Sequence, residues 1–373
     1  MGTIERTMLA AVAYRGEQRF HLEQVPVPEI GENDVLVKVT AVSITRGLLA
    51  MWFFTDLIRL LPGVIGHEFA GVIVKTGRSV AVFREGDRVR VHSTLTCGNC
   101  DQCRTDHESL CSSQCTIGYA LNGDGAMPLY ERYHNGGMAQ YVKVPAANLE
   151  AIPDNVTDEV AAKVGTLAGA LRALRMTEAQ FGDTLVITAS GGGAGASVAR
   201  CARLFGFTTI CGVSRNRGGL ERLRGPDGLT HSIATSELPS HWESEKLLSS
   251  AIREVSGAEG VDAVIDYMPS GTAVTLQAIH TMKGGGRAIL CGGNVVELNL
   301  SYLAVMRNQY QLKGMRGAMR RDEREIMKLL AAGYLNVSDL VTHVFPLTEV
   351  NHALETVIGR EEHPVFVMMK PWS

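Results

Sequence analysis

The sequence contains no long apolar run and no marked excess of one charge. No stretch of its 373 residues approaches the roughly 18 consecutive apolar residues of a membrane-spanning helix. The first 20 residues contain no apolar run of signal-peptide length, because Glu5 and Arg6 interrupt them early. The formal net charge of -3 provides no basic field for nucleic acid. We therefore expect a cytoplasmic protein that acts on a small molecule and has neither nucleic acid nor membrane as a partner.

The length and the order of predicted elements indicate two domains. A chain of 373 residues is longer than one hydrophobic core usually serves. The first 150 residues are mostly strand-like, as in the alternating segment 35–42 and in 86–91. Beyond Asp158, a predicted strand at 184–188, a helix at 196–205 and a strand at 208–213 form a βαβ unit. Further predicted elements are helices at 159–175, 220–224, 244–254 and 324–332 and strands at 263–266, 287–291 and 365–368.

Closely spaced cysteines form the clearest chemical motif. Cys97, Cys100 and Cys103 are followed by Cys111 in a chain with eight cysteines. Four thiolates make a closed tetrahedral zinc site, which holds a loop and leaves no open position for substrate. We therefore predict one structural Zn²⁺ per chain, although Cys115 is a fifth thiol that could replace Cys111. The alternative, ordinary loop or buried cysteines, does not account for the spacing.

A glycine-rich loop between a predicted strand and a predicted helix indicates a dinucleotide site. The loop occupies residues 190–195 and reads Ser-Gly-Gly-Gly-Ala-Gly. Glycines let the backbone approach a pyrophosphate, and the helix N-terminus supplies N–H groups and a positive dipole. Turns also use such glycines, but the strand-loop-helix context favours cofactor binding. The predicted cofactor-binding residues of the loop are Ser190, Gly192, Gly193, Ala194 and Gly195.

The end of the second strand favours NADPH over NADH. NAD-binding proteins carry an acid about 20 residues past the loop, where it bonds the ribose 2′-hydroxyl. Residues 211–217 contain no acid. Ser214 can instead hydrogen-bond a 2′-phosphate, and Arg215 can clamp it with its planar guanidinium. The alternative is that the arginines of this segment are solvated surface side chains.

Together these motifs resemble the medium-chain dehydrogenase/reductase superfamily, of the zinc alcohol dehydrogenase type. The segment Gly66–Val72, with Gly77 after it, is similar to the family's GHE signature. The four cysteines match its structural-zinc lobe, residues 190–195 match its coenzyme loop, and 284–287 resemble the turn before its last coenzyme-domain strand. The resemblance covers essentially the whole chain.

This resemblance implies an α/β protein with two domains. A GroES-like, β-rich catalytic domain is expected at residues 1–157 and 302–373, and a Rossmann NADPH-binding domain at 158–301. The resemblance also implies a homodimer or homotetramer.

Most positions of the family's catalytic zinc ligands have changed in this chain. The family uses a Cys after the third strand, the His of the GHE segment, and a Cys or Glu before the coenzyme domain. Here these positions align with Thr45, His67 and Gly165. The family's proton-relay hydroxyl and the Asp beside it align with Gly47 and Leu48. Catalytic zinc needs about three protein ligands, so we expect it to be absent unless the alignment is out of register.

Loss of the catalytic metal predicts a substrate that is already electrophilic. Zinc polarises a carbonyl and stabilises an alkoxide, so unactivated alcohols are difficult to oxidise without it. We predict an NADPH-dependent reductase that transfers hydride to an activated C=C or C=N bond of a small biosynthetic intermediate. The alternatives are a zinc-dependent alcohol dehydrogenase or carbonyl reductase, and a non-redox cyclase, lyase or cofactor-binding structural protein on this scaffold.

Four residues are candidates for catalytic roles. The Thr45 hydroxyl could bond a substrate oxygen, and Arg46 could stabilise an enolate or form a surface salt bridge. His67 could donate a proton or be a structural histidine, whereas Glu68 more readily supports the local fold. The segment 119–135 is longer than the family leads us to expect and could set substrate specificity or form an oligomer contact.

Overall fold

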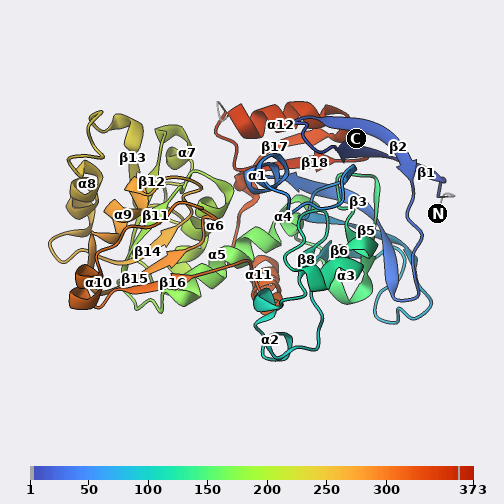
Figure 1. Cartoon of the computed structure of the whole chain (residues 1–373), viewed down its shortest axis with the longest axis horizontal. Coiled ribbons are helices and arrows are strands. Elements are labelled where there is room, and N and C mark those ends of the chain that lie inside the picture. The colour runs from blue at the N-terminus through green and yellow to red at the C-terminus, as the bar shows by residue number, and fades with distance from the viewer. Residues whose placement is uncertain (1–3, 360–361) are drawn as a thin grey trace. The chain divides into compact units, whose positions relative to one another are not determined.

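The computed structural model describes residues 4–359 and 362–373, which divide into two compact units. The first contains the described residues of Met1–Gly165, Met319–Tyr334 and Val341–Ser373. The second contains Thr166–Ala318 and Leu335–Leu340 (Figure 1). Among the described residues, no helix combines the length and apolar character that a membrane crossing requires.

The first unit is built on two mainly antiparallel sheets. One has the strand order β2-β1-β4, and the larger has the order β10-β6-β5-β3-β18-β17, with β9 also paired to β3. These strands are β1 (Thr7–Ala13), β2 (Phe20–Pro26), β3 (Asp34–Ile44), β4 (Gly63–Val64), β5 (Phe69–Thr76), β6 (Arg88–Val91), β9 (Tyr141–Pro145), β10 (Leu149–Ala151), β17 (Val341–Pro346) and β18 (Phe366–Lys370).

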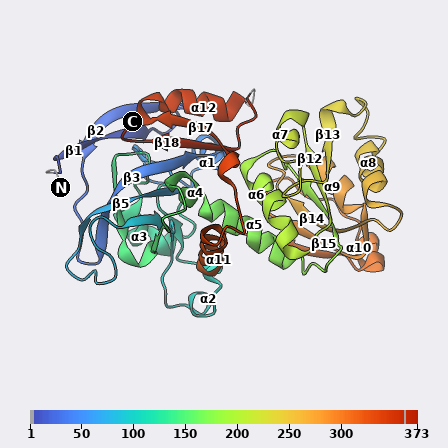
Figure 2. The ribbon, with the colours of Figure 1, turned by 180° about the vertical axis from the view of Figure 1, so that it is seen from behind.

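Strand β3 forms the centre of this unit. It pairs with β5, β9 and the C-terminal strand β18, so segments from the first and last parts of the sequence share one sheet (Figures 1 and 2). Its apolar residues, including Val35, Val37 and Val39, are fully buried. The predicted strand at 35–42 is therefore confirmed. Side chains on both of its faces are largely buried, because neighbouring elements cover them.

Helices and one small sheet complete the first unit. The two-stranded sheet consists of β7 (Thr94–Leu95) and β8 (Cys115–Thr116). The helices are α1 (Arg46–Phe54), α2 (Asp101–Arg104), α3 (Met127–Tyr133), α4 (Asp158–Ala162), α11 (Arg320–Ala331) and α12 (Val350–Gly359). Figure 2 shows α12 beside β17 and β18.

The second unit is a six-stranded parallel sheet with the order β13-β12-β11-β14-β15-β16. The strands are β11 (Thr184–Thr188), β12 (Thr209–Ser214), β13 (His231–Ala234), β14 (Val261–Asp266), β15 (Met282–Leu290) and β16 (Gln311–Gly314). The helices are α5 (Val164–Met176), which starts in the first unit, α6 (Gly193–Cys201), α7 (Arg217–Glu221), α8 (Leu247–Ser256), α9 (Ala273–Ile279) and α10 (Tyr302–Asn308). This strand order, 3-2-1-4-5-6 in chain sequence, is that of a Rossmann fold, so the predicted βαβ unit and α/β class are confirmed.

The unit boundaries differ from those expected at 157/158 and 301/302. Helix α4 belongs to the first unit, because it packs on β3 and β5. Residues 302–318 belong to the second unit, because α10 contacts β15 and β16 extends the parallel sheet by pairing with β15. Helix α11 is therefore the first element after the Rossmann sheet to return to the first unit.

The single helix predicted at 159–175 is wrong in one respect. Lys163 ends α4 with a ψ of 1°, and α5 starts at the next residue. The Ala- and Leu-rich composition of the segment gave no signal for this break. The break determines where the Lys163 side chain lies.

Candidate active site

A histidine-tyrosine pair forms the core of the candidate site in the first unit. His67 lies just before β5, and its ring centroid is 4.4 Å from that of Tyr119, with 33° between the ring planes. The Gly66 N–H donates to the Gly118 carbonyl at 2.8 Å and so aligns the two segments. Gly118 has a φ of +60°, and an added Cβ would lie 2.5 Å from the Gly136 backbone, so a larger residue does not fit.

The imidazole of His67 is held in its neutral form. Burial lowers its pKa, the negative charge of Glu68 opposes this, and the Lys163 cation lowers it further. The Nδ1 atom of His67 is buried and has no hydrogen-bond partner among the described residues. His67 therefore adds no positive charge to the site at neutral pH.

The positive charge beside His67 belongs to Lys163. Its ammonium donates to Glu68 Oε2 and to Ser43 Oγ, the latter at 3.3 Å, and lies 4.8 Å from the centroid of the Phe366 ring. Both members of the ion pair are buried, with Lys163 2% and Glu68 7% exposed. A buried ammonium is tolerated only when it is paired and hydrogen-bonded. The expectation that Glu68 supports the local fold agrees with this contact.

The buried ion pair of Lys163 was not predicted from the sequence. The lysine stands in the run Ala161-Ala162-Lys163-Val164, and a lysine within an apolar segment is itself a signal of a paired buried charge. The partner could not be identified, because Glu68 lies 95 positions away in the chain.

Thr45 and Arg46 have local structural contacts. Thr45 is the N-cap of α1, and its hydroxyl oxygen accepts from the Leu48 N–H at 3.1 Å. The Arg46 guanidinium donates to the carbonyls of Val357 and Ile358, both at 2.8 Å. Arg46 therefore attaches α1 to α12. This contact supports a structural role for Arg46 over stabilisation of an enolate.

Two hydroxyl groups border the position of Gly47. A Cβ atom added to Gly47 would lie 3.9 Å from Thr45 Oγ1 and 4.0 Å from the Tyr119 hydroxyl oxygen. The Tyr119 hydroxyl donates to the Gly47 carbonyl at 3.5 Å, which is long for a hydroxyl donor. Burial raises the pKa of Tyr119 to about 12, and the charge of Glu68 contributes to this shift. The phenol is therefore protonated across the neutral range.

The position of Gly165 faces two carboxylates. A Cβ atom added there would lie 3.6 Å from Glu323 Oε1 and 3.9 Å from Glu68 Oε1. Glu323 Oε2 accepts from Arg90 at 2.6 Å and contacts His92 Nδ1 at 2.5 Å. Burial acts to raise the pKa of Glu323, but Arg90 and His92 together lower it to about 2. This buried cluster was also missed in the sequence.

The three positions aligned with the family's zinc ligands offer one usual zinc ligand, His67. The Thr45 oxygen already caps a helix, and Gly165 has no side chain. Within residues 4–359 and 362–373, just one group of three or more His, Cys, Asp or Glu side chains is close enough to share a metal, and it does not include His67.

That group is the set of four cysteines predicted from spacing. The Sγ atoms of Cys97, Cys100, Cys103 and Cys111 all lie within 4.8 Å of one another. The Sγ–Sγ separations are 3.9 Å for Cys97–Cys103, 3.5 Å for Cys100–Cys103 and 3.6 Å for Cys97–Cys111. A tetrahedral Zn–S distance of about 2.3 Å requires sulfur atoms roughly 3.8 Å apart. The set therefore fits zinc, and Cys115, which lies buried in β8, is outside it.

The glycine loop of the second unit has the backbone expected for a phosphate site. Gly192 is the N-cap of α6, whose first N–H groups are free of intrahelical partners. A Cβ atom added to Gly195 would lie 2.5 Å from Ser190 Cα, so this close approach requires glycine. The buried Ser190 hydroxyl donates to the Val213 carbonyl at 3.1 Å, so its side chain holds the loop to β12.

The two arginines after β12 have different environments. Arg217 pairs with Glu237 and with Glu221, the latter at 3.2 Å. Arg215 is exposed, and its side chain forms no ion pair with any described residue. Of the two, Arg215 therefore has the guanidinium that is available to a ligand.

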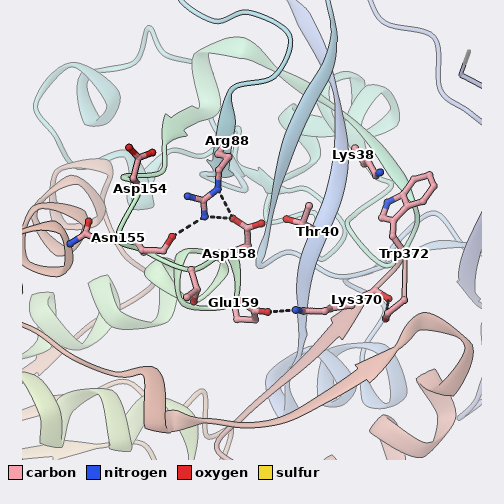
Figure 3. Close-up of a pocket in the computed structure, with 12 residues that line it drawn as sticks. Lys38, Thr40, Arg88, Asp154, Asn155, Asp158, Glu159, Lys370 and Trp372 are labelled. Carbon is pink, nitrogen blue, oxygen red and sulfur yellow. Dashed lines mark hydrogen bonds and ion pairs between the residues drawn. The ribbon is translucent and has the colours of Figure 1, made fainter. Parts of the chain in front are cut away.

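A separate surface pocket of about 600 Å³ in the first unit is lined by none of the candidate catalytic residues (Figure 3). Four of its charged side chains form two ion pairs, Arg88 with Asp158 and Lys370 with Glu159, both at 2.6 Å. Lys38 lies over the Trp372 ring, 4.2 Å from its centroid. We therefore assign no function to it.

Comparison with known proteins gives matches along most of the chain. Residues 31–154 match the family described as "Alcohol dehydrogenase GroES-like domain", and residues 193–332 match "Zinc-binding dehydrogenase". The chain is 30% identical over 341 residues to an L-threonine 3-dehydrogenase of Chelativorans sp. (strain BNC1), covering 90% of this chain and 91% of that protein. It is 27% identical over 353 residues to the L-threonine 3-dehydrogenase of Escherichia coli (strain K12), covering 94% and 96%.

Solved structures with the same fold include an NADP-bound protein. A putative zinc-binding dehydrogenase from Sinorhizobium meliloti 1021 bound to NADP has a TM-score of 0.83 and 23% identity, with 98% of this chain and 100% of that chain covered. The alcohol dehydrogenase TADH from Thermus sp. ATN1 also has a TM-score of 0.83 and 23% identity, with 97% and 99% covered. These matches confirm the expected combination of a GroES-like domain with a Rossmann domain.

Proposed function

Because the chain belongs to the zinc-type alcohol dehydrogenase family of medium-chain dehydrogenases/reductases, we propose that this oxidoreductase reduces an activated C=C or C=N bond with NADPH and without a catalytic zinc ion. The observation that carries the proposal is the composition of the site around His67. Where the family places metal ligands, this chain has a capping Thr45 and a side-chain-free Gly165, and a buried Lys163–Glu68 pair lies beside them.

The second unit contains the residues that would hold the cofactor. The N–H groups at the start of α6, in Gly193, Ala194 and Gly195, would bind the pyrophosphate, with Gly192 allowing close approach. Ser214 and Arg215 would bind the 2′-phosphate, and no acid between residues 211 and 217 would repel it. NADPH bound in this way supplies a hydride.

The substrate class follows from what the site lacks and what it contains. Without a metal to polarise it, a simple ketone is a poor hydride acceptor. An enone or an iminium ion accepts hydride at carbon because conjugation or a positive charge already withdraws electrons. The Thr45 hydroxyl beside Gly47 keeps its own proton while its oxygen caps α1, so it is suited to bind a substrate oxygen.

The four-cysteine lobe would hold a structural zinc ion. The lobe lies between β7 and β8, and β8 leads directly to Gly118 and Tyr119. Zinc at this lobe would fix the entry to the segment that contains Tyr119, with no open coordination position for substrate.

We also propose that the chain forms a homodimer through the edge of the Rossmann sheet. Strand β16 is an edge strand, and unpaired sheet edges readily pair with another chain. Large apolar side chains are exposed in the segment that precedes β16 in the chain, including Val295 (97%), Tyr302 (83%) and Met306 (53%). Sedimentation velocity of the wild type and of Met306→Asp would test this. The wild type is expected to be a dimer, and Met306→Asp is expected to dissociate more readily. A monomeric wild type would contradict the proposed dimer.

Hydride transfer from labelled cofactor tests the proposed activity. The purified enzyme is incubated with 4-deuterated NADPH and a panel of enones and iminium compounds, with NAD⁺ plus L-threonine or simple alcohols as the comparison. Deuterium at the electrophilic carbon of a reduced product is expected. Activity confined to alcohol or L-threonine oxidation would contradict the proposal and favour the zinc-dependent alternative.

A further inference from the structure

We propose that Tyr119 is a catalytic residue that donates the proton needed to complete reduction of a conjugated C=C bond. The inference rests on the proposed function and deepens it by identifying the proton donor and the C=C class of substrate. Three features of the site support it: where the phenol is held, how loosely its hydroxyl is bonded, and how the neighbouring polar groups are occupied.

The phenol is held rigidly at the site. Tyr119 follows β8, its backbone N–H donates to the Thr116 carbonyl at 3.1 Å, and its ring packs in a tilted arrangement against that of His67. Gly118 fits only as glycine between the Gly136 backbone and the Gly66 carbonyl, so the approach of the two segments is fixed. A ring held through its backbone and by the contact with His67 can present its hydroxyl in one direction, which proton transfer requires.

The hydroxyl lies where the family's relay hydroxyl is missing. Gly47 aligns with that position, and the Tyr119 oxygen is 4.0 Å from the point where a Gly47 Cβ would stand. Its contact with the Gly47 carbonyl, at 3.5 Å, is too long to hold the proton strongly. The proton is therefore available to a substrate atom that lies beside Gly47.

The other polar groups are less suited to this transfer. Lys163 is held by Glu68 and Ser43, and the aliphatic Thr45 hydroxyl is a much weaker acid than a phenol. His67 is neutral and buried at Nδ1. The raised pKa of Tyr119, about 12, keeps the phenol protonated before reaction, and an enolate is basic enough to accept its proton.

The reaction balances with groups already named. The β-carbon of the enone accepts a hydride, with its electron pair, from NADPH, and the C=C π pair shifts to give an enolate. The Tyr119 hydroxyl then transfers its proton to the α-carbon, forming the new C–H bond and leaving a phenolate. Solvent water returns a proton to the phenolate, and the net change is addition of hydride and one proton with NADP⁺ as the oxidised product. An iminium ion needs no such proton, so a dedicated donor favours the C=C substrate.

Tyr119→Phe tests the proposal, with Tyr130→Phe as a matched control. Tyr130 is also a buried tyrosine, 1% exposed, and burial raises its pKa to about 12. Its ring centroid lies 6.2 Å from that of His134, in a tilted arrangement. The probe is 2-methylcyclohex-2-enone with NADPH, and the readouts are kcat, the enantiomeric ratio of 2-methylcyclohexanone, and the Kd for NADPH from cofactor fluorescence. The enantiomeric ratio reports which face of the α-carbon receives the proton.

Wild type and Tyr130→Phe are expected to form one enantiomer in excess. Tyr119→Phe is expected to lower kcat by roughly 10²–10⁴-fold and to erode the enantiomeric excess, because solvent then delivers the proton, with the Kd for NADPH unchanged. Tyr119→Phe with wild-type kcat and enantiomeric excess would overturn the Tyr119 assignment alone. A wild type that transfers no hydride to any enone would overturn the proposed function, and the assignment with it.

Discussion

Lys163 and Glu68 form a buried ion pair inside the first unit. Lys163 is the residue directly after α4, and Glu68 directly follows His67 in the sequence. The pair is supported by the Ser43 hydroxyl and the Phe366 ring. It gives the site a fixed cation without a metal ion. Such a pair is costly to break, because either partner alone would be a buried uncompensated charge.

Replacing one member of this pair is predicted to destabilise the protein strongly. Lys163→Met should lower the free energy of unfolding by about 3–5 kcal/mol, whereas Lys163→Met combined with Glu68→Gln should recover much of that loss. Arg78→Met is the control, because Arg78 pairs with Glu32 on the surface, where a salt bridge contributes about 0–1 kcal/mol. Urea unfolding measures all four proteins, and a Lys163→Met variant as stable as Arg78→Met would be incompatible with the buried pair.

Removing one lobe cysteine is predicted to abolish zinc binding. Cys97→Ala leaves three thiolates, too few for a closed structural site, whereas Cys115→Ala removes a buried thiol outside the set. Zinc per chain, measured by elemental mass spectrometry, should fall to near zero in the first variant and stay at the wild-type level in the second. Equal zinc loss in both variants would show that the ligand set is misassigned.

Arg215 is predicted to distinguish NADPH from NADH. Arg215→Ala should raise the Kd for NADPH roughly 10- to 100-fold, because hydrogen bonds to charged groups contribute about 1.5–3 kcal/mol. The Kd for NADH should change little. Arg217→Ala is the matched control, since Arg217 is paired with Glu237 and Glu221. If Arg217→Ala weakened NADPH binding and Arg215→Ala did not, the assignment between the two arginines would be reversed.

The low pKa of Glu323 predicts a specific loss of stability in acid. Its pKa is about 2 in the folded protein against 4.5 ordinarily, so its stabilising contribution is present above about pH 4.5 and is lost as the pH falls toward 2. The loss should be on the order of 3 kcal/mol in the wild type. Unfolding of wild type and Glu323→Gln between pH 6 and pH 2 measures it. The difference between the two proteins should shrink as the pH falls, and a constant difference would argue against the shifted pKa.

Local sequence patterns predicted the Rossmann unit and the cysteine lobe well. The strand at 184–188, the glycine loop and the strand after it are close in sequence, so their pairing follows from a short connection. The spacing of Cys97 to Cys111 likewise reflects one local loop. Residues 302–318 were predicted to lie in the catalytic domain but belong to the second unit. The local sequence of β16 does not indicate which sheet the strand joins.

The interior charges could not be predicted because they join distant segments. Glu323 is 233 positions from Arg90 and 231 from His92, and each residue alone is compatible with an exposed surface. Tyr119 and His67 meet through glycines whose role is evident only in three dimensions. The aligned losses at Thr45 and Gly165 were visible in the sequence, but the buried cation beside them was not.

The zinc content of active wild-type enzyme tests the central claim most directly. The protein is purified without chelators, shown to transfer deuterium from labelled NADPH to an enone or iminium product, and analysed for zinc by elemental mass spectrometry. The active wild type is expected to contain one zinc ion per chain, and Cys97→Ala is expected to contain none. Two zinc ions per active chain, one of them remaining in Cys97→Ala, would contradict the proposal.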